Sequence, residues 1–145
     1  MSDTMTTVRQ REVVEEHIRG ENNGDWTTVY DTFLQDGREH FEVVPMGAKF
    51  EGIEGIRGFY KTVAQALPDF HIEVVSEYDV PGYSIREIIA TGTHKGDFAG
   101  VKPLGKSIRI PMAIFFTYDS ASEKLISERV YYDRASMVAQ MEGTA

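Results

Sequence analysis

Apolar residues recur at helical spacing in the first half of the chain. From about residue 8 to 21, Val14, His17, Ile18 and Glu21 fall on one face, and the letters NNGD end the segment. Asp25 is placed to cap a second helix with an inward aromatic stripe. The clearest stripe predicts a third helix over residues 54–67, which Pro68 ends. Its inward residues are Ile56, Phe59, Tyr60, Val63 and Leu67.

The remaining segments have the patterns of strands and turns. REHFEVVP predicts a short strand, and the turn Pro45-Met46-Gly47 joins it to a second extended piece in a hairpin. Beyond Pro68, four segments predict long antiparallel strands: DFHIEVVSEYDV, YSIREIIATGTHKG, KSIRIPMAIFFTYD and KLISERVYYD. A short helix follows Asp133. This order predicts an α+β fold in which a strongly bent sheet curls over the helices and leaves a pocket between them.

The strand over residues 107–119 is apolar on both faces. Met112, Ile114 and Phe116 alternate with Ala113 and Phe115. One face would cover the helices and the pocket, while the other would pack on a second copy of the chain, so we expect a homodimer. Pro111 removes a backbone donor and is expected to mark a bulge in this strand.

Length, composition and charge restrict the class of protein. The 145 residues, 41% of them hydrophobic, predict a single domain over residues 1–145 with its core at about 8–142. The absence of cysteine excludes disulfides and thiol chemistry. A net charge of −8 argues against a nucleic-acid partner. Without a long apolar run or a signal segment, we expect a cytoplasmic protein with no membrane partner.

Four strings in order give the chain a family resemblance. FEGIEGIRGFY, ALPDFHIEV, TGTHKGDFAGVKPLGK and ERVYYDRASMVAQM make residues from about Arg11 to Met141 resemble the SnoaL-like polyketide cyclase group. This group lies within the nuclear transport factor 2 and ketosteroid isomerase-like superfamily. The resemblance implies a cone-shaped α+β barrel, with a strongly curved, mostly antiparallel sheet wrapped around N-terminal helices (cystatin-like, nuclear transport factor 2-like). It also implies an apolar pocket with polar groups at its deep end, and usually a homodimer.

The resemblance alone does not carry a mechanism to this chain. Ketosteroid isomerases have a base aspartate before a Pro-x-Gly turn, a helical tyrosine and a protonated strand aspartate, and these positions match Val44, His17 and Ala113. The cyclase pattern of a last-strand aspartate with a polar partner matches Tyr131 and Ala113, with Asp133 one inward step further along. Because the superfamily includes isomerases, cyclases, epoxide hydrolases, dehydratases and non-enzymes, function depends on the site itself.

The end of the last strand offers two candidate catalytic residues. Tyr131 is a candidate donor to a developing oxyanion, and Asp133 is a candidate acid or base if apolar walls raise its pKa. The alternative for Asp133 is an N-cap, because RASM and an apolar helical stripe follow it.

Two histidines are further catalytic candidates. His94 shares a strand face with small residues that leave room for a ligand, and its alternative role is a strand-end histidine bonded to backbone or solvent. His17 lies on an apolar helical stripe, where it is either a satisfied core residue or a pocket group. His40 and His71 have no polar companion and receive no role. No metal-binding spacing occurs, and GIEGIRG lacks the context of a nucleotide loop, so neither a metal nor a cofactor is expected.

These residues favour a small cofactor-independent enzyme that binds an apolar carbonyl-containing or polycyclic molecule. Its proton-transfer chemistry would be cyclisation, isomerisation or dehydration, with His17, His94, Tyr131 and Asp133 as the catalytic set. A non-catalytic binding or dimerisation module is the second hypothesis, because the family acid/base positions read Val44 and Ala113. An epoxide hydrolase is the third, although Arg129 with Asp133 supplies only part of an Asp–Arg–Asp set.

Overall fold

The computed structural model describes residues 5–144, which form four helices, a short 3₁₀ turn and six strands. In chain order they are α1 (Thr7–Asn23), α2 (Trp26–Asp31), β1 (His40–Val43), the 3₁₀ turn η1 (Val44–Met46), β2 (Ala48–Glu51), α3 (Gly52–Ala66), β3 (His71–Val80), β4 (Tyr83–Thr93), β5 (Ser107–Asp119), β6 (Lys124–Tyr132) and α4 (Arg134–Glu142). None of the helices in this described part is both long enough and apolar enough to cross a membrane.

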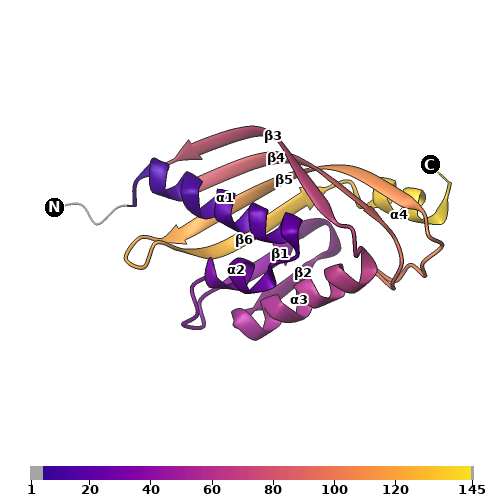
Figure 1. Ribbon diagram of the computed structural model, residues 1–145, viewed down its shortest axis with the longest axis horizontal. Coiled ribbons are helices and arrows are strands. Elements are labelled where there is room, and N and C mark those ends of the chain that lie inside the picture. Colours follow the sequence, from indigo (N-terminus) through magenta and orange to yellow (C-terminus); the bar gives the residue numbers. More distant parts are fainter. Residues whose placement is uncertain (1–4, 145) are drawn as a thin grey trace.

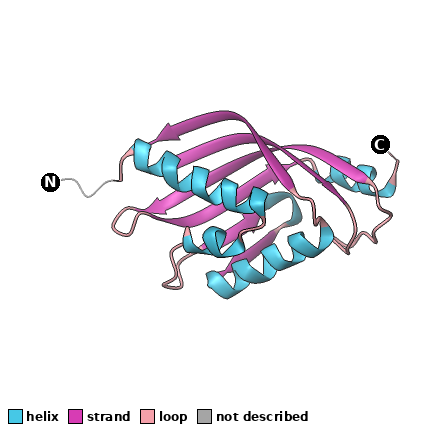
Figure 2. Ribbon diagram, viewed as in Figure 1, coloured by secondary structure: helices cyan, strands magenta, loops and turns pink. Residues whose placement is uncertain are grey.

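All six strands belong to one curved sheet, which confirms the predicted α+β class. The strand order is β2-β1-β6-β5-β4-β3, and within residues 5–144 the outer edges of β2 and β3 have no strand partner, so the sheet is curved but open. β1 and β6 run parallel, and the other neighbours are antiparallel. Helix α1 packs on β3 and β4, α3 on β1 and β2, and α4 on β5 (Figure 1). Figure 2 shows α1, α2 and α3 gathered on one face of the sheet.

A β-bulge decides which residues of β6 face inward. On β5, Ile114 and Phe116 are buried and lie opposite Val130 and Glu128 of β6. The register shifts between Thr117 and Tyr118, which pair with Ser127 and Leu125, so one extra β6 residue, Ile126, lies between these two. Such an insertion reverses the inward and outward alternation along the strand. The bulge expected at Pro111 is absent, because that residue pairs with Ile89 in continuous register.

The predicted helix boundaries agree with the structure to within a few residues, and two predicted caps are confirmed. Asp25 accepts a hydrogen bond from Thr28 N at the start of α2. Asp133 accepts one from Ser136 N at 3.1 Å, at the start of α4. Each side chain satisfies a backbone N–H that has no partner within its helix.

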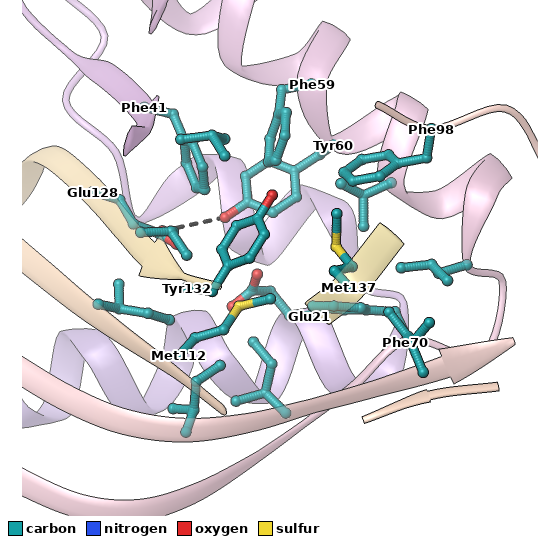
Figure 3. A pocket seen from close by; sticks show the side chains of 18 residues that line it. Glu21, Phe41, Phe59, Tyr60, Phe70, Phe98, Met112, Glu128, Tyr132 and Met137 are labelled. Atoms are coloured by element: carbon teal, nitrogen blue, oxygen red, sulfur yellow. Dashed lines mark hydrogen bonds between the residues drawn. The ribbon is translucent and has the colours of Figure 1, made fainter. Parts of the chain in front are cut away.

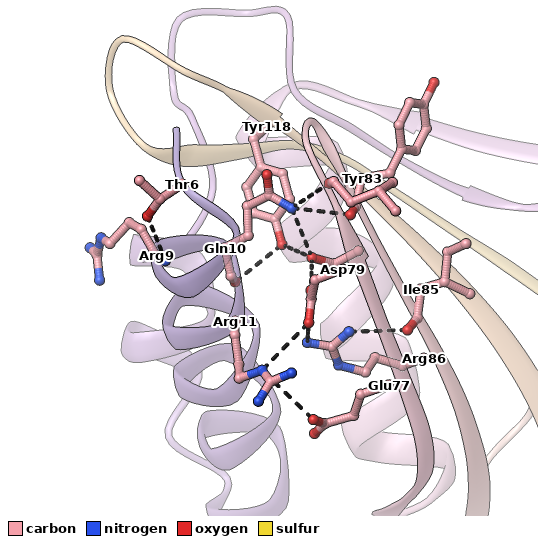
Figure 4. Close-up of polar contacts among 12 residues, drawn as sticks. Thr6, Arg9, Gln10, Arg11, Glu77, Asp79, Tyr83, Ile85, Arg86 and Tyr118 are labelled. Carbon is pink, nitrogen blue, oxygen red and sulfur yellow. Dashed lines mark hydrogen bonds and ion pairs between the residues drawn. The ribbon is translucent and has the colours of Figure 1, made fainter. Parts of the chain in front are cut away.

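A polar network around a buried ion pair of the β3–β4 hairpin connects this hairpin to α1 (Figure 4). Arg86 is only 1% exposed, and its Nη2 lies 3.2 Å from Asp79 Oδ1. Arg11 of α1 approaches the same carboxylate, with Nε 3.5 Å from Oδ2. The Gln10 amide donates to two carbonyls of the hairpin, and the Tyr118 hydroxyl donates to the Gln10 carbonyl. This network joins α1 to β3, β4 and β5 at one end of the sheet.

Candidate active site

An apolar cavity of about 70 Å³ lies between α3 and the inner face of the sheet (Figure 3). Its walls are mainly aromatic and aliphatic side chains, and its aromatic members are Phe41, Phe59, Tyr60, Phe70, Phe98 and Tyr132. Two carboxyl groups, Glu21 and Glu128, also line it, whereas no Lys, Arg, Asp or His of the described chain does. The volume is about half that of an engineered cavity of about 150 Å³ that holds benzene.

The two carboxyl groups converge on the imidazole of His17. Its Nε2 lies 2.8 Å from Glu128 Oε1 and 3.3 Å from Glu21 Oε1. The Tyr60 hydroxyl lies 3.2 Å from the same nitrogen and donates to Glu128 Oε1 at 3.2 Å. All four residues are buried, with at most 5% of their surface exposed. We call these four residues, His17, Glu21, Tyr60 and Glu128, the acid–imidazole cluster.

Thr32 fixes which nitrogen of His17 carries a proton. The Thr32 hydroxyl donates its single hydrogen to the Val29 carbonyl at 2.6 Å. The hydroxyl oxygen therefore accepts the 2.9 Å hydrogen bond from His17 Nδ1–H. Nε2 is left to face Glu128, and a separation of 2.8 Å between these two atoms requires a proton between them. His17 and Glu128 thus share a proton inside the protein.

Burial makes Glu21 a weak acid. Desolvation raises the pKa of its carboxyl from 4.5 to about 8, against the lowering effect of His17 and with a further rise from the charge of Glu128. Among the described residues, no hydrogen-bond partner reaches Glu21 Oε1. Glu21 is therefore mainly protonated at neutral pH, although it lies beside an ionisable histidine.

The other two members of the acid–imidazole cluster respond to the same carboxyl groups. Burial alone would lower the pKa of His17, but the charges of Glu21 and Glu128 and the hydrogen bond to Glu128 outweigh it and raise the pKa. Burial, followed by the charges of Glu128 and Glu21, raises the pKa of Tyr60 well above its ordinary value. Tyr60 therefore remains a neutral hydrogen-bond donor.

The cluster comes from three distant parts of the sequence. His17 and Glu21 are four residues apart on α1, which places both on one helical face. Tyr60 belongs to the apolar stripe of α3, and Glu128 enters from β6 beyond the bulge. The sequence pattern placed Glu21 on the inward face of the first helix and Tyr60 in the third helical stripe, but it gave neither a chemical role. The pattern did not point to Glu128. Glu128 and Tyr131 lie on opposite faces of β6, and the face of Tyr131 was expected to be the inward one.

Tyr131 does not face the cavity, which corrects the placement expected from sequence. It pairs with Ala113 on the outer face of the sheet, packs edge-on against Phe115 and is 39% exposed. Its neighbour Tyr132 lines the cavity instead. The family's acid and partner positions, aligned by sequence, fall on Tyr131 of β6 and Ala113 of β5, which both face outward. That alignment is therefore out of phase with the inner face by one residue.

The remaining candidates also lie apart from the cluster. Asp133 is exposed and caps α4, and it does not line the cavity. His94 follows β4 directly and is completely buried, but it is not a cavity-lining residue either. No hydrogen-bond partner within residues 5–144 reaches either of its ring nitrogens. Of the four predicted catalytic residues, only His17 belongs to the acid–imidazole cluster.

The cluster is also the one group of His, Asp and Glu side chains in the described chain with metal-ligand proximity. Donor atoms of His17, Glu21 and Glu128 all lie within 4.8 Å of one another. Sequence spacing did not reveal this group, because Glu128 comes from a different element. Nε2 of His17 and the Tyr60 hydroxyl already pair with Glu128, so we interpret the arrangement as a proton-sharing network.

Comparison with known proteins identifies the family. The model of the SnoaL-like polyketide cyclase family matches residues 9–141, and the chain belongs to this family. No curated protein matches the sequence.

Solved structures share the fold at low sequence identity. A Jannaschia protein described as a SnoaL-like polyketide cyclase has a TM-score of 0.82 and 19% identity, over 95% of this chain and 93% of that one. A Catenulispora acidiphila protein with a ketosteroid isomerase-like fold, solved with trimethylamine, gives 0.75 and 21%, over 90% and 92%. IdmH of Streptomyces antibioticus, described as a polyketide cyclase, gives 0.74 and 18%, over 92% and 98%. These likenesses establish a nuclear transport factor 2 and ketosteroid isomerase-like fold.

Proposed function

We propose that this protein is a cofactor-independent enzyme that moves protons on an apolar, carbonyl-containing small molecule. The observation that carries the proposal is the acid–imidazole cluster, which places two buried carboxyl groups at the wall of an otherwise apolar cavity. Two carboxyl groups in different environments are a recurrent means of providing an acid and a base at the same pH. Cyclisation, isomerisation and dehydration can each use such a pair of acid and base.

The contacts suggest a role for each group. Glu21, protonated at neutral pH, donates a hydrogen bond to the substrate carbonyl and stabilises the enolate oxygen. Glu128 accepts the proton that leaves carbon, and His17 and Tyr60 hold this carboxylate in place and redistribute the proton. The apolar walls exclude water, which strengthens these hydrogen bonds.

The size of the cavity restricts the substrate. About 70 Å³ suits a compact molecule in the conformation observed. A polycyclic substrate requires wall side chains such as Phe98, Met112 and Met137 to move outward. An epoxide-hydrolase site built on Asp and Arg has no support here, because neither residue type is found among the lining residues of the described chain.

Deuterium exchange tests this function without knowledge of the natural reaction. Compact cyclic ketones and enones are incubated with the protein in D₂O, and loss of their α-protons is followed by NMR. The proposal expects exchange faster than in buffer alone for at least one ketone that binds. If ketones bind in the cavity and none exchanges, the non-catalytic binding module becomes the better account.

The outer face of the sheet supports a homodimer, which we also propose. Tyr78, Val80, Tyr83 and Tyr131 are apolar or aromatic residues, each 39–55% exposed, on the three strands β3, β4 and β6. An exposed apolar surface of this kind is typical of an interface. Light scattering at micromolar concentration should give about twice the chain mass of 16.4 kDa. A single-chain mass at all concentrations would refute the dimer.

A further inference from the structure

Two carboxyl groups line the cavity, whereas no basic side chain of the described chain does. We propose that the cavity binds a small organic ammonium ion, with the charged nitrogen between Glu21 and Glu128 and the hydrocarbon part against the aromatic walls. This inference deepens the proposed function, since it assigns a charge class to the ligand of the same cavity. It rests on that cavity being a ligand site, but it does not depend on catalysis.

The ionisable groups around the cavity are unequally balanced between acids and bases. Glu21 and Glu128 both line the cavity, and His17 behind them is the single basic side chain in contact with either in the described chain. One imidazolium can neutralise one carboxylate. The other carboxyl group, Glu21, keeps its proton near neutral pH and can ionise only if a second positive charge arrives. A cationic ligand would supply that charge, whereas an anionic ligand would find no counter-ion.

Glu21 Oε1 is an acceptor without a well-formed hydrogen bond. It is buried at the cavity wall, and no donor among residues 5–144 makes a hydrogen bond to it. His17 Nε2, at 3.3 Å, pairs instead with Glu128 at 2.8 Å. Buried carboxyl oxygens normally accept hydrogen bonds, and charged donors make the strongest ones. An ammonium N–H has both the hydrogen and the charge that this oxygen lacks.

The walls of the cavity are rich in aromatic rings. Phe41, Phe59 and Tyr60 stack or meet edge-to-face, and Tyr132 also lines the cavity (Figure 3). Ring faces attract cations, and the attraction grows where water is excluded. The net charge of −8 also favours the approach of a cation.

Binding of the ammonium ion should release a proton. The ion RNH₃⁺ meets Glu21 as a neutral carboxyl group and forms the ion pair RNH₃⁺·⁻OOC, so the O–H proton leaves to solvent. The groups that face Glu21 are His17 of the same helix, Tyr60 of α3 and Glu128 of β6. Because the pKa of Glu21 is about 8, the affinity should rise with pH until about pH 8 and then level off.

Methionine-methyl NMR provides a local test. Met112 and Met137 line the cavity, so their methyl signals report its occupation. Full-length protein in EDTA is titrated with isopropylammonium chloride, propan-2-ol and sodium acetate, three compact probes that differ in charge. We expect isopropylammonium to bind about tenfold or more tightly than propan-2-ol, and acetate not to shift these signals. Equal affinities for the ammonium ion and the alcohol would overturn the inference.

Two variants identify the carboxyl group responsible. Glu21→Gln keeps the shape and neutrality of the protonated side chain, and it should bring the isopropylammonium affinity down to that of propan-2-ol. Glu16→Gln, on the exposed face of the same helix, should retain the full preference. If Glu21→Gln does not fold, calorimetry of the wild type in phosphate and in HEPES replaces it. Ammonium binding without proton release at pH 7 would then overturn the inference.

The inference and the proposed function fail in different ways. Charge-selective ammonium binding without exchange of any bound ketone removes the enzyme and keeps the ammonium site. Ketone exchange without preference for the ammonium ion removes the ammonium site and keeps the enzyme.

Discussion

Glu128→Gln is expected to slow α-proton exchange of a responsive ketone by roughly 10²-fold or more, because general acid–base catalysis typically contributes about 10²–10⁴. The substituted amide would occupy nearly the same volume as the carboxylate but could not take a proton from carbon at neutral pH. It would also end the proton sharing with His17 Nε2 at 2.8 Å. The exchange rate per bound ketone, measured by NMR in D₂O, checks this expectation.

Two further variants show whether a slower exchange rate comes from loss of a catalytic group or from a general structural effect. Glu21→Gln should also slow exchange, but by a smaller factor, because an amide N–H still donates a hydrogen bond to the enolate oxygen. Asp133→Asn should leave the rate unchanged, since Asp133 caps α4 and does not line the cavity. If exchange persists at the wild-type rate in Glu128→Gln, the base is a different group.

Arg86→Met is expected to destabilise the fold by about 3–5 kcal/mol, the usual cost when one member of a buried ion pair is removed. Asp79 is buried, with 5% of its side chain exposed, and it would lose its 3.2 Å contact with Nη2. Arg11, at 3.5 Å and largely exposed, compensates this charge only in part. Urea unfolding followed by circular dichroism measures the loss.

The exposed Arg38 is the matched control for Arg86. It pairs with Asp36 and Asp119 at the surface, so Arg38→Met should change the free energy of unfolding by less than about 1 kcal/mol. A similarly small loss in Arg86→Met would mean that water or neighbouring groups solvate Asp79 as well as Arg86 does. The ion pairs of Asp79 with Arg86 and Arg11 would then contribute little to the free energy of unfolding.

Local patterns predicted most of the fold. Helical stripes, strand alternation and the caps Asp25 and Asp133 all correspond to observed elements, because each depends on residues close in sequence. The joining of the β1–β2 hairpin to β6 was not predicted, since a parallel pairing between distant strands leaves no local signal. The open form of the sheet follows from that pairing and from the unpaired edges of β2 and β3.

The site was less accessible from sequence than the fold. A single extra residue of β6, Ile126, lies opposite Thr117 and Tyr118 of β5 and reverses the alternation along β6. The inward carboxylate is therefore Glu128 and not the expected Asp133. Periodicity cannot reveal a bulge of this kind. Glu21 was on the inward helical face from the outset, but its significance depends on burial and on partners that only the folded chain brings together.

The raised pKa of Glu21 also links the cluster to stability. A carboxyl group that titrates at 4.5 when unfolded and at about 8 when folded holds its proton more tightly in the native state. Its contribution to stability is therefore complete below about pH 4.5 and is lost as pH rises toward 8. The raised pKa of His17 acts in the same direction. The cluster therefore makes the fold less stable at alkaline pH than at acidic pH, and shifted pKa values of this kind are common among catalytic groups.

The most direct test of the acid–imidazole cluster is the titration of the Glu21 side-chain carboxyl carbon by ¹³C NMR, with its signal assigned by its loss in Glu21→Gln. We expect a midpoint near pH 8, well above the ordinary value of 4.5, because the carboxyl group is buried. A midpoint near 4.5 would show that Glu21 is ionised at neutral pH, and it would contradict its role as the proton donor of the acid–imidazole cluster.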